Sequence, residues 1–144
     1  MGRLLAIDYG RKRCGVAATD TLRIVATALE TVATYDLNTY ILGYISREPV
    51  DAIIVGWPLN MNGEPSESTR YIRPGIERLR KVLPESIRII FFDERFTSSL
   101  AHRSMIDSGM TRTQRRDKSL PDRMAATIIL NDFLQSRSYE QLNK

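Results

Sequence analysis

The sequence predicts an α/β fold built on one five-stranded mixed sheet with flanking helices. Short apolar runs that end in a charge or a turn are typical of buried strands. Three such strands open the chain with no helix between them, which predicts antiparallel pairing, whereas the later strands alternate with helical patterns, which predicts parallel pairing. Because the chain has 144 residues, we expect a single domain over residues 1–144.

The opening strands are separated by short turns. Residues 3–8 form an apolar run that ends in Asp8, and residues 9–12 form a turn that contains Gly10. Residues 13–19 and about 23–32 follow as the second and third strands. We therefore expect the sheet to begin with an antiparallel meander.

The rest of the chain alternates helices with strands. Asp36 is expected to cap a helix whose apolar residues keep the spacing of one helical face until Pro49 stops it. The further elements are a strand at 52–55, a helix over 65–82 that Pro74-Gly75 kinks or splits, a fifth strand at 87–92, a helix from Thr97 or Ser98 to about 107, a basic loop over 110–119 and a last helix over 120–135.

The chain contains one histidine and one cysteine, and these counts exclude several kinds of site. A zinc site within the chain needs about four such ligands, a disulfide needs two cysteines, and a catalytic triad would depend on His102. The working groups of an enzyme are therefore expected to be carboxylates, which bind hard cations through oxygen. Without a disulfide, a signal peptide or an apolar span, we expect a cytoplasmic protein that does not bind membranes.

Three carboxylates stand at the ends of predicted elements. Asp8 ends the first strand and Glu94 follows the fifth, so both are expected at the edge where open α/β sheets bind ligands. Asp122 extends the apolar stripe of the last helix, which continues with Ala125, Ala126, Ile129 and Phe133. If the three side chains converge, they can hold one or two Mg²⁺ or Mn²⁺ ions for phosphoryl transfer.

Each of these residues also has a simpler interpretation. Asp8 is equally typical of a turn, and Asp122 of a helix-start charge that points to water. Asp93-Glu94 is typical of a solvated loop. Strand alternation lets only one of the two side chains face the ligand-binding edge of the sheet, and Glu94 has the longer side chain. Trp57 follows the fourth strand in a turn, where it fits either stacking on a base or packing under the loop.

Basic residues flank the carboxylates in the sequence, although the net charge is only +4. Charge runs are more often solvated surface, but cations beside a carboxylate cluster would hold the phosphates of a nucleic acid close to a metal site. The residues expected to bind nucleic acid are Arg11, Lys12, Arg13, Arg95, Arg112, Arg115, Arg116 and Lys118.

Four motifs, taken in order, resemble the YqgF family over nearly the whole chain. They are Ile7-Asp8-Tyr9-Gly10 with Arg13-Cys14-Gly15-Val16-Ala17, the run IVGWPLNMNG over 54–63, the run DERFTS over 93–98, and Asp122 before Ala125-Ala126 and Ile129-Leu130. The resemblance implies an RNase H-like fold with helices on both faces of the sheet. It also implies a metal-dependent bacterial nuclease whose acidic residues fall on Asp8, Glu94 and Asp122. Pro121 and Pro74-Gly75 depart from the family pattern and put local geometry, rather than the carboxylates, in doubt.

The resemblance leaves the substrate open. It implies either maturation of the 5′ end of 16S rRNA from its precursor, with ribosomal particles as further partners, or resolution of Holliday junctions in DNA. A junction favours a symmetric homodimer, whereas a monomer can trim RNA; the lack of an obvious dimer helix favours RNA. Two alternatives are a non-catalytic nucleic-acid-binding protein with this fold and an ATP-handling relative of the actin and sugar-kinase group. The second of these needs another domain, for which 144 residues leave no room.

Overall fold

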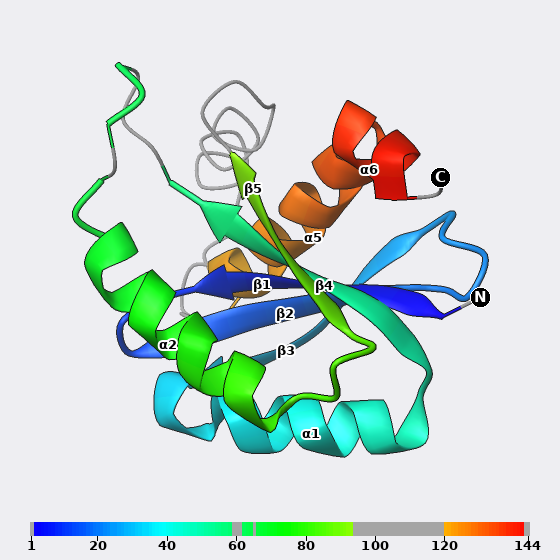
Figure 1. Cartoon of the computed structure of the whole chain (residues 1–144), viewed down its shortest axis with the longest axis horizontal. Helices are drawn as coiled ribbons and strands as arrows, with labels where there is room; N and C mark the ends of the chain where they lie inside the picture. Colours follow the sequence, from blue (N-terminus) through cyan, green and yellow to red (C-terminus); the bar gives the residue numbers. More distant parts are fainter. Residues whose placement is uncertain (1, 59–61, 65, 94–119, 143–144) are drawn as a thin grey trace.

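The computed structural model describes residues 2–58, 62–64, 66–93 and 120–142, and five strands within them form one sheet (Figure 1). The strands are β1 (Arg3–Tyr9), β2 (Arg13–Thr19), β3 (Ala26–Ala33), β4 (Val50–Trp57) and β5 (Arg88–Asp93). The helices are the 3₁₀ turn η1 (Thr34–Asp36) and the α-helices α1 (Leu37–Arg47), α2 (Thr69–Val82), α5 (Leu120–Leu134) and α6 (Arg137–Leu142). The predicted α/β class is confirmed.

The strand order is β3-β2-β1-β4-β5. β2 pairs antiparallel with both β1 and β3, which confirms the predicted meander. β4 pairs parallel with β1 and with β5, and helical crossovers make this possible. The carboxyl ends of β1, β4 and β5 therefore meet at one edge of the sheet.

Helices cover both faces of the sheet. Along β1, Leu5 and Ile7 belong to the core formed with α1 and α2, whereas Leu4 and Ala6 belong to the core formed with α5. Figure 1 shows α1 and α2 on one side of the sheet and α5 with α6 on the other. Because successive side chains of a strand point to opposite faces, each residue at the carboxyl edge can be assigned to one of the two faces.

The predicted apolar stripe of the last helix is confirmed. Ala125, Ala126, Ile129 and Phe133 are buried, and α5 packs on β1, β2 and β3. Phe133 also meets Phe92 of β5 edge to face, with ring centroids 5.7 Å apart. The small alanines let the start of the helix approach the sheet closely.

The third strand begins at Ala26, so its predicted start near Arg23 is wrong. Arg23 has a φ of 58°, which lies in the left-handed region. The backbone N–H groups of Ile24 and Val25 donate to Asp20 Oδ1 at 2.7 and 2.9 Å. This Asp-capped turn takes residues that the apolar pattern assigned to the strand.

Asp36 does not act as the predicted side-chain cap of α1. The chain enters α1 through η1, so the backbone of Asp36 is already helical (φ −97°, ψ −4°), and its side chain makes no capping hydrogen bond. A capping residue needs an extended backbone to direct its oxygen at the helix N–H groups.

Pro74 does not split the second predicted helix. Helix α2 runs without interruption from Thr69 to Val82, although it starts four residues later than expected. Pro74 removes one backbone hydrogen bond near the first turns, which the surrounding packing tolerates.

The sequence patterns missed α6, a six-residue polar helix whose Tyr139 and Leu142 pack against the core on the α5 side. The helix predicted from Thr97 or Ser98, His102 and the basic loop over 110–119 lie outside the described residues. In the ranges that the structure describes, the helices are too short or too polar to cross a membrane.

Candidate functional site

Asp8 is the next-to-last residue of β1 and lies at the carboxyl edge of the sheet, as predicted. It pairs with Gly15 of β2 and is partly buried. Its position in the alternation matches that of Leu4 and Ala6, which places Asp8 on the α5 face. A partly buried carboxylate at this edge of a central strand is well placed to meet a ligand.

A small cavity of about 170 Å³ lies at the same edge. It is lined by Asp8 and Tyr9 from β1, Gly56 and Pro58 from the end of β4, and Ser68, Tyr71 and Ile72 from the start of α2. The cavity therefore joins the ends of two central strands to the beginning of a helix.

The structure describes one of the two neighbouring carboxylates at the end of β5, which is Asp93. Ile90 and Phe92 belong to the core that faces α5, whereas Phe91 packs against the opposite core. Asp93 ends β5 and continues the alternation of Phe91, so it is out of phase with Asp8. Glu94 lies outside the described residues.

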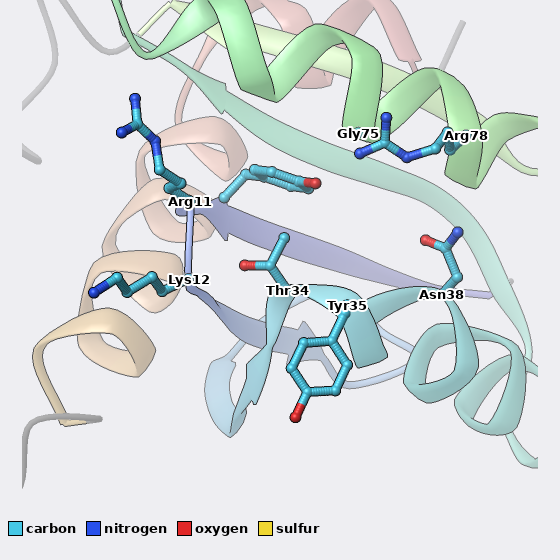
Figure 2. A pocket seen from close by; sticks show the side chains of 8 residues that line it. Arg11, Lys12, Thr34, Tyr35, Asn38, Gly75 and Arg78 are labelled. Carbon is cyan, nitrogen blue, oxygen red and sulfur yellow. The ribbon is translucent and has the colours of Figure 1, made fainter.

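Asp122 lies in the first turn of α5, which begins at Leu120. Figures 1 and 2 both show the start of α5 near the carboxyl end of β1. The side chain of Asp122 is outside the described part of the structure, and among the side chains that are described no three potential metal ligands gather. The convergence of Asp8, Glu94 and Asp122 therefore stays a prediction.

The bend between β1 and β2 is held in place by Thr34 of η1. The Thr34 N–H donates to the carbonyl oxygen of Lys12 at 3.0 Å, and the Thr34 hydroxyl donates to the carbonyl oxygen of Gly10 at 2.8 Å. A Cβ atom on Gly10 would collide with the carbonyl oxygen of Arg13, so the tight bend requires glycine. These contacts fix the segment that carries the first group of predicted nucleic-acid contacts.

Three of the predicted nucleic-acid-binding residues, Arg11, Lys12 and Arg13, are exposed on or beside this bend. The Arg11 guanidinium lies over the ring of Tyr71, 5.2 Å from its centroid. Tyr71 also lines the small cavity beside Asp8, so this cation stands close to the candidate carboxylate. The other predicted cations, Arg95, Arg112, Arg115, Arg116 and Lys118, lie outside the described residues.

Sequence reasoning missed a second, larger cavity of about 650 Å³. It lies between the β1–β2 bend, the η1–α1 segment and α2, and we call it the basic pocket. Figure 2 shows Arg78 reaching in from α2 and Thr34 and Asn38 on the opposite wall. Tyr35 follows Thr34 with its ring pointing outward, and Arg11 and Lys12 lie at one end. Tyr9 and Gly75 complete the lining. The one signal in the sequence was a glycine inside a helical pattern, which often marks a close approach.

Tyr9 connects the two cavities, because it lines both. Burial raises the pKa of the Tyr9 hydroxyl, and the nearby Cys14 acts in the same direction. Arg78 opposes this rise through its charge and through a hydrogen bond with the Tyr9 side chain. Tyr9 therefore stays protonated, and able to donate a hydrogen bond, at neutral pH.

Trp57 packs within the protein, which favours the simpler of its two interpretations. Its ring meets Phe91 edge to face at 4.9 Å, and the Arg73 guanidinium lies 5.0 Å from its centroid. One face of the indole is therefore already covered by a cation of α2.

A family model described as "RuvX: Holliday junction resolvase" matches residues 2–136. The chain belongs to the RuvX family. This is the YqgF family of the sequence motifs, so the resemblance is confirmed.

Curated relatives of this RuvX chain match it almost end to end. A protein of Phocaeicola vulgatus is 51% identical over 139 residues, covering 96% of this chain and 99% of the relative. A protein of Porphyromonas gingivalis is 48% identical over 136 residues, covering 94% and 98%. Both carry the name "Putative pre-16S rRNA nuclease".

The fold is shared with a solved resolvase structure. The structure titled "T. thermophilus RuvC in complex with Holliday junction substrate" superposes with a TM-score of 0.59, covering 94% of this chain and 96% of that one. The sequences are only 13% identical, so the likeness concerns the fold alone. It confirms the expected RNase H-like architecture.

Proposed function

We propose that this RuvX chain is a nuclease that hydrolyses phosphodiester bonds at the carboxyl edge of its sheet and processes the 5′ end of precursor 16S rRNA. The observation that carries the proposal is the position of Asp8, a partly buried carboxylate at the end of a central strand on the α5 face. The names of relatives that are about half identical over nearly their full length support the choice of substrate.

The candidate metal ligands are Asp8, Glu94 and Asp122. Glu94 directly follows Asp93, whose phase in β5 is opposite to that of Asp8, so continued alternation would bring Glu94 onto the α5 face. Asp122 belongs to the first turn of the helix that covers the same face. A set of carboxylate oxygens suits Mg²⁺ or Mn²⁺, and one or two such ions would supply an activated water and stabilise charge on the phosphate.

The protein's own groups would position the nucleic acid around these ligands. Arg11 and Lys12 are exposed on a bend that Thr34 holds close to Asp8, so they can neutralise backbone phosphates on either side of the cleaved bond. Arg13, Arg95, Arg112, Arg115, Arg116 and Lys118 are proposed to extend this contact.

Substitution of Asp8 tests the function directly. Asp8→Asn should abolish cleavage of a precursor 16S rRNA fragment in Mg²⁺ or Mn²⁺, while leaving the fold and RNA binding largely intact. Glu85→Gln removes one carboxylate charge at an exposed position after α2 and is the matched control. Normal cleavage by a pure Asp8→Asn preparation would contradict the assignment.

Holliday-junction resolution is the second candidate, because the matching family model carries that description. Side-by-side cleavage of a four-way junction and the rRNA fragment separates the two substrates. Junction resolution also predicts a symmetric dimer, which sedimentation would detect. Binding without cleavage of either substrate, together with no effect of Asp8→Asn on a calorimetric Mn²⁺ titration, would favour a non-catalytic binding protein.

A further inference from the structure

We propose that the basic pocket binds one nucleotide of a single-stranded segment of the substrate, separately from the carboxylate edge. The proposal rests on the proposed function for the identity of this ligand as substrate. Its independent basis is the combination of charge, aromatic surface and position in a cavity that the expected metal site does not use.

The charge of the pocket favours a phosphate. Arg11, Lys12 and Arg78 are three of the described residues that line it, and no described lining residue is a carboxylate. Arg78 points into the cavity from α2, whereas Arg11 and Lys12 stand at the end nearest the β1–β2 bend (Figure 2). Arginine and lysine side chains are the groups that commonly bind phosphate in proteins.

An exposed tyrosine supplies a surface for a base. Tyr35 is 87% exposed and lines the pocket from the η1 side, with its ring pointing outward and away from Arg78. Aromatic side chains on which bases stack, combined with cations that follow the backbone, are the usual elements of single-strand binding. The cavity of about 650 Å³ also falls within the range of small-ligand sites.

The pocket adjoins the cavity beside Asp8. Tyr9 lines both cavities, and its ring lies 6.4 Å from that of Tyr71. The Arg11 guanidinium lies above Tyr71 at the boundary. Asp8 lies on the α5 face and the pocket on the side of α1 and α2, so a strand whose phosphate reaches Asp8 would pass around the carboxyl end of β1 to place a neighbouring nucleotide in the basic pocket.

The walls of the pocket are held by contacts that exist without ligand. Thr34 donates hydrogen bonds to two carbonyl oxygens of the β1–β2 bend. Because Gly75 has no side chain, the Tyr9 hydroxyl can pack directly against α2. A preformed pocket loses less conformational entropy when it binds a nucleotide.

Binding without cleavage tests the pocket. Fluorescence anisotropy of a labelled single-stranded RNA, with the full chain in EDTA, should show at least about fivefold weaker binding for Tyr35→Ala, the lower end of the effect of a base–aromatic stack. Tyr35→Phe keeps the ring and should bind within about twofold of the unmodified protein.

The charge is tested in the same assay with a matched pair of arginines. Arg78→Ala should reduce the slope of log K against log salt by about 0.7, as expected for one lost phosphate contact to a single strand. Arg80 lies on the same helix, is exposed, pairs with Glu77 at 3.5 Å and does not line the pocket. Arg80→Ala should therefore leave the slope unchanged.

Photo-crosslinking requires no substitution and therefore does not depend on variants that fold. Ultraviolet crosslinking of the unmodified protein to a thiouridine-containing strand should label the segment from Thr34 to Asn38. Crosslinks found only elsewhere, or equal affinity and salt slope for all four variants, would overturn the proposal. So would AMP that binds the pocket without displacing the RNA, because the pocket would then serve a free nucleotide.

The two proposals fail in different ways. A protein that cleaves RNA through Asp8 but binds equally well after the pocket substitutions is a nuclease without this subsite. If binding depends on the pocket but no RNA is cleaved, the nucleotide site is supported and the nuclease proposal is contradicted.

Discussion

The hydroxyl of Tyr9 occupies the space in which residue 75 would carry a side chain. A Cβ atom built on Gly75 would collide with the hydroxyl oxygen and ring carbons of Tyr9. Tyr9 is buried at the end of β1, and Gly75 is buried in α2. The glycine inside α2 therefore allows the close approach of the helix to the strand that ends at the candidate site.

We expect Gly75→Ala to lower the free energy of unfolding by roughly 1–3 kcal/mol, the usual cost of overpacking. Gly43→Ala is the matched control, because Gly43 lies in α1 and nothing lies within 4 Å of a Cβ atom built there. That control should gain about 0.5–1 kcal/mol from helix propensity. Urea unfolding of both variants measures the difference, and a stabilising effect at both positions would contradict the clash.

The double variant Gly75→Ala with Tyr9→Leu tests whether the Tyr9 ring is the cause of the clash. Removing the ring should make the added methyl group less costly than it is beside Tyr9. Tyr9→Phe should not give this relief, because the ring carbons that the methyl group meets remain in place.

The sequence predicts a kink or a split of the helix at Pro74-Gly75, but the structure shows one continuous helix. A local pattern could not show this, because it does not contain long-range contacts. Periodicity predicted the strands and the buried face of α5, because a repeat of two or of 3.6 residues is a local property. The role of Gly75 depends on Tyr9, which is 66 positions away in the chain, and no local pattern contains that contact. Asp36 failed as a cap for a related reason, since η1 had already turned its backbone into the helix.

The candidate site also has one part that the sequence predicts and one part that it does not. Asp8 was predictable because it ends an apolar run, and the edge formed by parallel strands is a general rule. The basic pocket was not, because it combines residues of a bend, a 3₁₀ turn and a helix whose proximity arises only on folding. Arg78 and Tyr35 have no motif of their own in the sequence.

We expect Arg73→Ala to uncover Trp57. The guanidinium lies 5.0 Å from the indole centroid and 5.2 Å from that of Phe91, so its loss exposes the ring and costs about 0.5–1 kcal/mol. Because the chain has one tryptophan, tryptophan fluorescence reports this site alone. The emission maximum of the Arg73→Ala variant should shift to longer wavelength. Arg70→Ala, on the same helix and also exposed, is the control. An equal shift in both variants would mean that Arg73 does not cover the ring.

We expect Asp51→Ala to destabilise the turn before β3. The Arg23 side chain is only 5% exposed, and its Nη2 donates to Asp51 Oδ2 at 2.6 Å. Oδ2 also accepts from the backbone N–H of Gly2 at 2.8 Å. Loss of hydrogen bonds to a charged group should cost about 1.5–3 kcal/mol, toward the lower end because Asp51 is half exposed.

Asp51→Asn keeps an acceptor and should cost less than Asp51→Ala. A double-mutant cycle with Arg23→Met isolates the coupling between the two side chains. Additive losses in that cycle would show that the ion pair contributes no coupling energy.

We expect stability to fall above pH 10 through three tyrosines. Burial is the main cause that raises the pKa of Tyr9, Tyr40 and Tyr44 above the ordinary value of 10.0. A tyrosine with a higher pKa in the folded chain holds its proton more tightly there than in the unfolded chain. The resulting stabilisation is complete below the unfolded value and is lost as pH rises through the raised folded values. Denaturant unfolding at a series of pH values, with tyrosinate absorbance followed in parallel, should therefore show no loss from these tyrosines between about pH 7 and 9 and a decline above pH 10. A variant with phenylalanine at all three positions should decline less steeply, and parallel profiles would remove these hydroxyls as the cause.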